Sequence, residues 1–296
     1  MAIQYGKAPF QLLDAIFPRL SARLALQRFV TPRRWPMPAW EQEIAERAKA
    51  IALADGYSGW SWGKGRTVLL VHGWEGRVTQ LGRFIEPLAG RGFRVIGFNA
   101  PAHGEQPGKA LNVVEYGRFL QRVVAEHAPL HGVIAHSMGA SAFAFAARAP
   151  LPVERAVLIS PANSVAGVVQ RFEDLLDLSA RTRSLLRQRL ERKIFNGPLA
   201  ELDLSARVPK FLPPVLLLAT NDDQDVPIAD TQRLALHWPN AHMKIAPRAG
   251  GHRKLLRDAR AIDAAVRFLA EDAWIRQAPD DQTAPRRRAG EVARAY

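Results

Sequence analysis

A serine at the apex of a predicted sharp turn is the most reactive feature of the sequence. Ser137 lies in Ala135-His136-Ser137-Met138-Gly139, after the apolar run 131–134 and before the small and apolar residues 140–145. This pattern predicts a strand, a tight turn and a helix, which together strain the serine backbone and lift its hydroxyl clear of a sheet. The second residue on each side must be small, and Ala135 stands where glycine is usual. Ser137 is therefore our candidate nucleophile.

A serine hydroxyl attacks only when a base removes its proton and an acid orients that base. His252 follows two glycines, which let its loop bend so that the imidazole points back toward a sheet edge. The acid is expected after the apolar run 215–218, where Asp223 is our choice. Asp222 and Asp225 are the alternatives, and all three could instead be turn formers or helix caps.

Backbone N–H groups must bind the oxyanion that such an attack produces. Met138, directly after the candidate nucleophile, supplies one of them. The second is expected from Trp74 in His72-Gly73-Trp74, which follows the apolar run 67–71. We expect no metal and no organic cofactor, because the histidines near these motifs lie on separate loops without the spacing of metal ligands.

The composition is that of a soluble globular protein. Of 296 residues, 48% are hydrophobic and 23% are charged, and none is cysteine, which excludes disulfides and thiol catalysis. No apolar stretch reaches the about 18 residues of a membrane span, and the first residues lack the apolar core of a signal peptide. We therefore expect a cytoplasmic protein.

The net charge of +13 raises the alternatives of nucleic-acid or membrane binding. The basic residues cluster at 181–193 and 286–288, with no interleaved aromatic residues and no nucleic-acid-binding motif. We expect a solvated basic face and no nucleic-acid partner. A basic patch beside a pocket would also favour an anionic substrate.

Strand-like and helix-like segments alternate along the chain. Strands are predicted at 67–71, 93–98, 132–135, 155–159, 215–218 and 242–245, and helices at 40–54, 80–90 and 113–127. This alternation predicts an α/β fold with a mostly parallel central sheet flanked by helices.

Four segments make up the predicted domain organisation. They are an N-terminal helical extension (1–55), an α/β core (56–161 and 213–275), a helical lid insertion (162–212) and a disordered basic tail (276–296). The insertion is too long for a simple crossover and follows a strand at the edge where open α/β sheets bind ligands. The alternative is one crossover helix with a long loop.

The N-terminal extension has an apolar helical stripe, made by Phe10, Leu13, Phe17, Leu20 and Leu24. We expect the stripe to pack on the main domain. The alternative is a peripheral membrane contact assisted by Arg19, Arg23 and Arg28, which we do not favour because Asp14 and the modest charge of the segment do not indicate a strong membrane binder.

The motifs at 69–74, 97–104, 135–139, 223–227 and 251–252 resemble those of the α/β-hydrolase superfamily, in the order that this family uses. The resemblance covers roughly residues 60–272. One departure is Asn99, where members commonly carry aspartate, and we expect it to affect loop hydrogen bonds rather than chemistry. The resemblance implies a Ser–His–Asp triad without metal or organic cofactor, and it leaves the substrate open.

We therefore predict a serine hydrolase that cleaves a carboxylic ester or related acyl bond through an acyl-enzyme, as esterases, thioesterases and lipases do. Its partner would be a small acyl substrate. The alternatives are an acyltransferase that uses the same triad and a non-catalytic binding protein of the same fold. Acceptor-dependent products would reveal the first alternative, and a misaligned triad would reveal the second.

Overall fold

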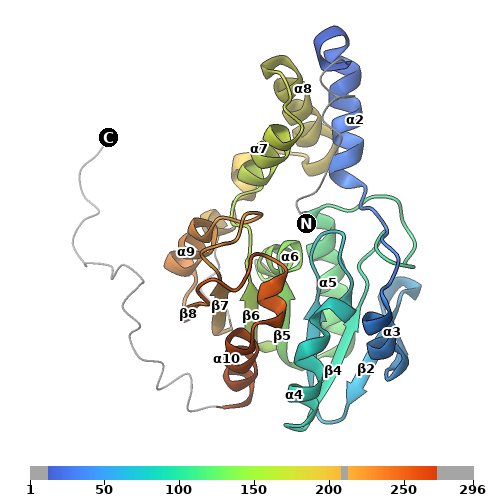
Figure 1. Cartoon of the computed structure of the whole chain (residues 1–296), viewed down its shortest axis with the longest axis vertical. Helices are drawn as coiled ribbons and strands as arrows, with labels where there is room; N and C mark the ends of the chain where they lie inside the picture. Colours follow the sequence, from blue (N-terminus) through green and yellow to red (C-terminus); the bar gives the residue numbers. More distant parts are fainter. Residues whose placement is uncertain (1–12, 208–212, 272–296) are drawn as a thin grey trace, which may run out of the picture.

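One eight-stranded sheet, in the order β1-β2-β4-β3-β5-β6-β7-β8, organises the chain (Figure 1). The structure is a computed structural model that describes residues 13–207 and 213–271. Strands β3 to β8 are mutually parallel, whereas β2 is antiparallel to β4 and to β1. The strands are β1 (Lys49–Ala52), β2 (Ser58–Gly63), β3 (Arg66–Val71), β4 (Phe93–Phe98), β5 (Leu130–His136), β6 (Val153–Ile159), β7 (Val215–Ala219) and β8 (Ala241–Ile245).

The central strands are buried on both faces, which is why they read as continuous apolar runs rather than as alternating patterns. Every residue of β5 and of β7 is buried. Helices α5 (Val113–His127), α6 (Met138–Ala146) and α9 (Ile228–His237) contribute to the core on one face. The other face is covered by the 3₁₀ helix η2 (Val78–Phe84), α4 (Ile85–Ala89), the 3₁₀ turn η6 (Lys254–Arg257) and α10 (Ala259–Ala270).

The predicted α/β-hydrolase architecture is confirmed, and the helix predicted at 113–127 coincides with α5. Asn112 begins this helix and accepts hydrogen bonds from the backbone N–H groups of Val114 and Glu115. The helix predicted at 40–54 is wrong in its second half, because α3 (Ala39–Glu46) ends early and residues 49–52 form β1. Strand β1 lies at the edge of the sheet, and pairing with β2 satisfies the backbone groups on one of its sides. No local sequence pattern signals that pairing.

A separate layer of helices stands above the sheet edge (Figure 1). It contains α2 (Pro18–Val30), α7 (Val165–Leu175) and α8 (Ala180–Leu190), which we call the upper helices. They share their own apolar cluster, to which Ala22 and Ala25 of α2 and Leu186 of α8 belong. Helix α2 of the N-terminal extension thus packs with the helices of the insertion, whereas β1, also within residues 1–55, belongs to the central sheet. The insertion continues in the short π-helical turn η3 (Glu191–Phe195) and the 3₁₀ turns η4 (Leu199–Leu202) and η5 (Leu204–Arg207).

The N-terminal helix packs on the rest of the chain as expected, but not through its apolar stripe. The side chains of Phe17, Leu20 and Leu24 are exposed, and α2 is buried through the small residues Ser21, Ala22 and Ala25 instead. Small side chains allow a closer approach of α2 to α8, which turns the larger residues outward. Phe10 lies outside the described residues, as does the basic tail predicted at 276–296.

Asp14, in the N-terminal extension, is buried and has a structural role. Its carboxylate accepts hydrogen bonds from the backbone N–H and hydroxyl of Ser179 and from the hydroxyl of Thr182, at the start of α8. A carboxylate at this position also stabilises the positive end of the helix dipole. Among the described residues, no helix is both long and apolar enough to cross a membrane.

Candidate active site

Ser137 lies at a sharp turn between β5 and α6. Its φ of 54° and ψ of −125° place a non-glycine residue in the left-handed region of φ, which is a strained conformation. The backbone N–H of Ser137 donates to the carbonyl of Ile159 at 2.8 Å, and its own carbonyl accepts from the N–H of Ser141 at 3.0 Å. The neighbouring strand β6 and the following helix α6 thus hold the strained turn from both sides.

Small residues around Ser137 are required by the close approach of the β3 loop. A side chain on Gly139 would place its Cβ 2.3 Å from the carbonyl oxygen of His72, and one on Gly73 would lie 2.8 Å from the Cβ of Ser137. Ala135 is fully buried between Val71 of β3 and Leu158 of β6. An alanine is accommodated there, so the departure from glycine does not disturb the turn.

His252 and Asp223 meet across the carboxyl end of β7. The Nδ1–H of His252 donates to Asp223 Oδ2 at 2.7 Å, and Asp223 Oδ1 accepts from the backbone N–H groups of Asp225 and Val226, each at 2.9 Å. Gly250 and Gly251 both have positive φ, as the expected bend of this loop requires. Because Nδ1 carries the proton, the lone pair of His252 resides on Nε2.

The electrostatics of Asp223 favour its ionised form. Burial raises its pKa, but the hydrogen bond from His252, the charge of His252 and the N–H of Val226 together outweigh burial and leave the pKa below its usual value. Asp223 therefore stays charged and keeps the His252 ring in one orientation.

The two alternative carboxylates have other partners. Asp222 accepts from the N–H of Gly250 at 2.8 Å and from the hydroxyl of Thr220, so it ties the histidine loop to the end of β7. Asp225 is exposed. Ligand atoms of Asp223, Asp225 and His252 lie within 4.8 Å of one another, which raises the question of a metal. Since Nδ1 of His252 is already engaged with Asp223, the group fits a hydrogen-bonded pair better than a metal centre.

Two further buried histidines support the site, and sequence reasoning did not assign either a role. His136 lies beneath His252, with ring centroids 4.6 Å apart, and its Nε2–H donates to the carbonyl of His252 at 3.3 Å. His72 accepts from the N–H of Ala100 through Nε2 and donates from Nδ1 to the carbonyl of Gly73, both at 2.8 Å. No local signal distinguishes these histidines from ordinary core residues, because their partners are set by the fold.

Burial keeps these histidines neutral. It lowers the pKa of His72 to about 3, with a further contribution from the nearby His103. Burial also lowers the pKa of His136 well below its usual value, and a positive charge on His252 lowers it further. Both rings must therefore lose their proton when the chain folds at mildly acidic pH.

This burial predicts a loss of stability in acid. Between about pH 6.5 and pH 3 the unfolded chain binds a proton at His72 that the folded chain does not, so the free energy of unfolding falls as the pH falls. The expected slope is about 1.4 kcal/mol per pH unit for each such histidine. Urea unfolding of the wild type and of His72→Asn between pH 7.5 and pH 4.5 measures it. An equal slope in both proteins would contradict the prediction.

The two candidate oxyanion donors flank Ser137. Within the described residues, no hydrogen bond uses the backbone N–H of Trp74 or of Met138 as a donor, so both N–H groups remain available to a ligand. Met138 begins α6, where the helix dipole adds a partial positive charge. Trp74 lies in a turn closed by a hydrogen bond from the N–H of Gly76 to the carbonyl of Gly73 at 3.1 Å.

Asn99 holds the base of this turn. Its side-chain oxygen accepts from the N–H of Val78 at 3.1 Å, and its amide donates to Glu105 at 3.3 Å. The expectation that this residue acts in loop hydrogen bonding agrees with these contacts.

Four of the five candidate residues line one pocket of about 740 Å³, and Asp223 contacts that pocket only through His252; among the described residues, no hydrogen bond joins the Ser137 hydroxyl to His252. Ser137, Met138, Trp74 and His252 all line it, and so do Arg28 and Phe29 of α2. Its upper wall comes from the upper helices and η3 and is mostly apolar, with Arg28 and Arg171 as its charged members; the apolar residues are Phe29, Val165, Val168, Phe172, Leu175 and Phe195. The N-terminal helix therefore contributes to the pocket, which its position in the sequence did not suggest.

The strand order and the serine turn after β5 define the α/β-hydrolase class of folds. A model of the alpha/beta hydrolase family matches residues 68–289, and the chain belongs to that family. None of the curated proteins matches the chain.

Solved structures with the same fold include esterases. An esterase from Pyrococcus furiosus is 20% identical with a TM-score of 0.59, over 81% of this chain and 97% of its own. A hydrolase from Pseudomonas aeruginosa is 18% identical with a TM-score of 0.56, over 77% of this chain and 99% of its own. An esterase from Exiguobacterium antarcticum is 15% identical with a TM-score of 0.55, over 75% of this chain and 98% of its own. At these identities the likeness is one of fold.

Proposed function

We propose that this protein is a serine esterase that cleaves carboxylic esters of apolar acids through a covalent acyl-enzyme. The observation that carries the proposal is the hydrogen bond of 2.7 Å between His252 Nδ1 and Asp223 Oδ2, in a pocket that the strained Ser137 also lines. Two structural relatives are esterases, which agrees with this reaction. The acyl chemistry, the triad and the oxyanion donors are our assignments.

The reaction would proceed in two halves. His252 Nε2 takes the proton of Ser137 as Oγ attacks the acyl carbonyl, while Asp223 stabilises the imidazolium that forms. The N–H groups of Met138 and Trp74 bind the oxyanion. His252 then gives its proton to the leaving alcohol, and a water molecule activated by the same imidazole releases the acid and regenerates Ser137.

The apolar upper wall favours an acyl chain over a polar group. Each methylene removed from water contributes about 0.8 kcal/mol, so kcat/KM is expected to rise about fourfold for each carbon added to a p-nitrophenyl ester until the wall is covered. Assays from acetate to decanoate measure this rise. Val168→Trp should flatten the series by filling the pocket, whereas Gln170→Trp, on the exposed side of α7, should leave it unchanged. A flat series in the wild type would contradict an apolar acyl site.

A direct test of the reaction class is covalent labelling. A fluorophosphonate probe should react with the wild-type protein at one serine, and mass spectrometry of the digest should find the probe on Ser137. Product analysis with added alcohols would separate hydrolysis from transfer to an acceptor other than water. Folded protein that neither labels nor cleaves an activated ester would refute the proposal.

A further inference from the structure

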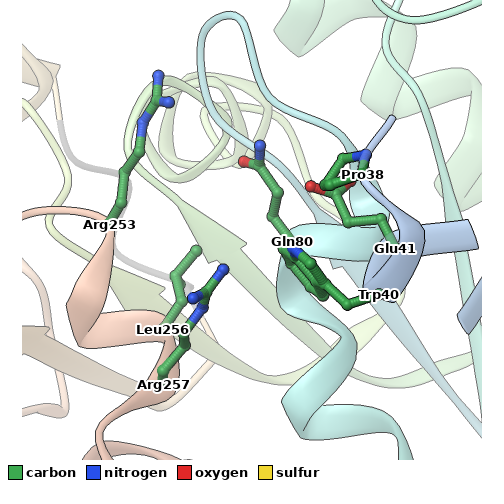
Figure 2. A pocket seen from close by; sticks show the side chains of 7 residues that line it. All are labelled: Pro38, Trp40, Glu41, Gln80, Arg253, Leu256 and Arg257. Carbon is green, nitrogen blue, oxygen red and sulfur yellow. The ribbon is translucent and has the colours of Figure 1, made fainter. Parts of the chain in front are cut away.

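An N-terminal strap, residues 31–41, lies against the loop that carries Trp74. Arg34 donates to the carbonyls of Gln106 and Gly108, each at 2.9 Å, and Glu41 accepts from the hydroxyl of Thr79. Figure 2 shows the end of the strap beside Gln80 of η2, across a hollow of about 260 Å³ from η6. The strap precedes residues 68–289, which match the family model.

The most extensive contact of the strap is between Arg33 and Glu75. The backbone N–H of Arg33 donates to Glu75 Oε1 at 3.2 Å, its Nε donates to both carboxylate oxygens at 3.0 and 3.1 Å, and its Nη2 donates to Oε2 at 2.9 Å. The Glu75 side chain is only 2% exposed, whereas that of Arg33 is 33% exposed. In the part of the chain that the structure describes, no other group donates a hydrogen bond to this buried carboxylate.

Glu75 lies in a strained part of the turn, directly after Trp74. Its φ of 52° is in the left-handed region, which a non-glycine residue adopts only when its surroundings enforce it. His72 and Asn99 hold this turn from the core, and Arg33 holds it from outside. Without Arg33 the buried carboxylate would have to turn toward water, and the strained turn would relax with it, which would reorient the peptide group between Gly73 and Trp74 that carries the Trp74 N–H.

We propose that Arg33 and Glu75 are positioning residues that hold the N–H of Trp74 in the oxyanion hole, so that the N-terminal strap completes the catalytic site. This inference rests on the proposed esterase function. An oxyanion donor acts in the transition state more than in the ground state, so its displacement lowers kcat and leaves KM nearly unchanged. Complete removal of such a donor lowers kcat by about 10²–10³-fold. A misplaced Trp74 N–H should therefore lower kcat by no more than this.

The test compares Arg33→Ala, Arg33→Lys and Glu75→Gln with the wild type. We expect Arg33→Ala to lower kcat about 10²-fold at unchanged KM. Arg33→Lys should recover part of the loss, because an ammonium keeps the charge but loses the two-point geometry. Arg47→Ala is the matched control, since Arg47 pairs with Glu86 at 3.1 Å on an exposed surface and should leave kcat unchanged.

A second readout separates positioning from simple stabilisation. An alkyl boronic acid forms a tetrahedral adduct at the serine, so its affinity should fall in parallel with kcat/KM in Arg33→Ala, while the thermal unfolding midpoint reports folding separately. If Arg33→Ala does not fold, kcat and boronate affinity of Arg33→Lys and Glu75→Gln are compared with those of the wild type instead. Variants that are folded and keep kcat and boronate affinity within twofold would overturn the inference and leave the esterase proposal intact. A wild type that neither labels nor cleaves esters would overturn the esterase proposal itself, and with it the assigned role of the pair.

Discussion

Replacing Ser137 with alanine is expected to abolish fluorophosphonate labelling and to lower kcat for ester cleavage by about 10⁴-fold or more. The reason is that the hydroxyl forms the covalent bond to the acyl group, and no neighbouring group can replace it. Labelling is read by in-gel fluorescence, and kcat by release of p-nitrophenol.

Ser141→Ala is the matched control for this change. Ser141 lies one helical turn after Ser137, and its hydroxyl donates to the carbonyl of Ala162 at 2.9 Å, so it is committed to a structural contact. The Ser141→Ala protein should keep the probe on Ser137. Labelling that survives in Ser137→Ala and disappears in Ser141→Ala would exclude Ser137 as the nucleophile.

Replacing Asp223 with asparagine is expected to lower kcat by about 10³–10⁴-fold with little change in KM. The asparagine side chain favours the wrong tautomer of His252, because its NH2 group donates a hydrogen bond to an Nδ1 that then holds the lone pair and leaves the ring proton on Nε2. The lowered pKa of Asp223 means that the wild-type side chain remains charged across the neutral range, so this loss should appear at every pH from 6 to 9. Steady-state kinetics over that range measures it.

The neighbouring carboxylates provide the comparison. Asp225→Asn removes an exposed charge close to His252 but leaves the hydrogen bond on Nδ1 in place, so it should lower kcat far less than Asp223→Asn does. Asp222→Asn weakens the contact with the N–H of Gly250 and should act through loop stability rather than through the tautomer of His252. A larger loss in Asp225→Asn than in Asp223→Asn would reassign the acid of the triad.

Much of the fold and of the candidate site could be predicted because it depends on local sequence. The buried strands are continuous apolar runs, the turn around Ser137 needs small neighbours, and the loop of His252 needs its glycines. The apolar run of β7 places three acidic residues at the sheet edge, and the hydrogen bond of His252 to Asp223 agrees with the choice of Asp223 over Asp222 and Asp225. Each of these signals lies within a few residues of the feature that it predicts.

Edge pairing and helix packing were predicted less well. Strands β1 and β2 were missed, since their pairing depends on the exposed edge of β4 rather than on an apolar run. The apolar stripe of α2 was expected to pack inward, but small residues on the opposite side of the helix approach α8 more closely. Periodicity identifies an amphipathic helix, and it cannot say which partner the fold will bring to which face.

The sequence by itself determined the family, the central sheet and the order of serine, acid and histidine, because strand propensity, turn chemistry and motif spacing are local properties. Only the tertiary structure decided which distant groups meet. Asp14 reaches Ser179 across 165 residues, His136 reaches His252 across 116, and Arg33 reaches Glu75 across 42. The sheet brings His136 and His252 together by placing the ends of its strands at one edge, whereas Asp14 meets Ser179 at the start of α8 and Arg33 meets Glu75 where the strap crosses the β3 loop. In each case a buried polar group needs a partner that no sequence pattern specifies.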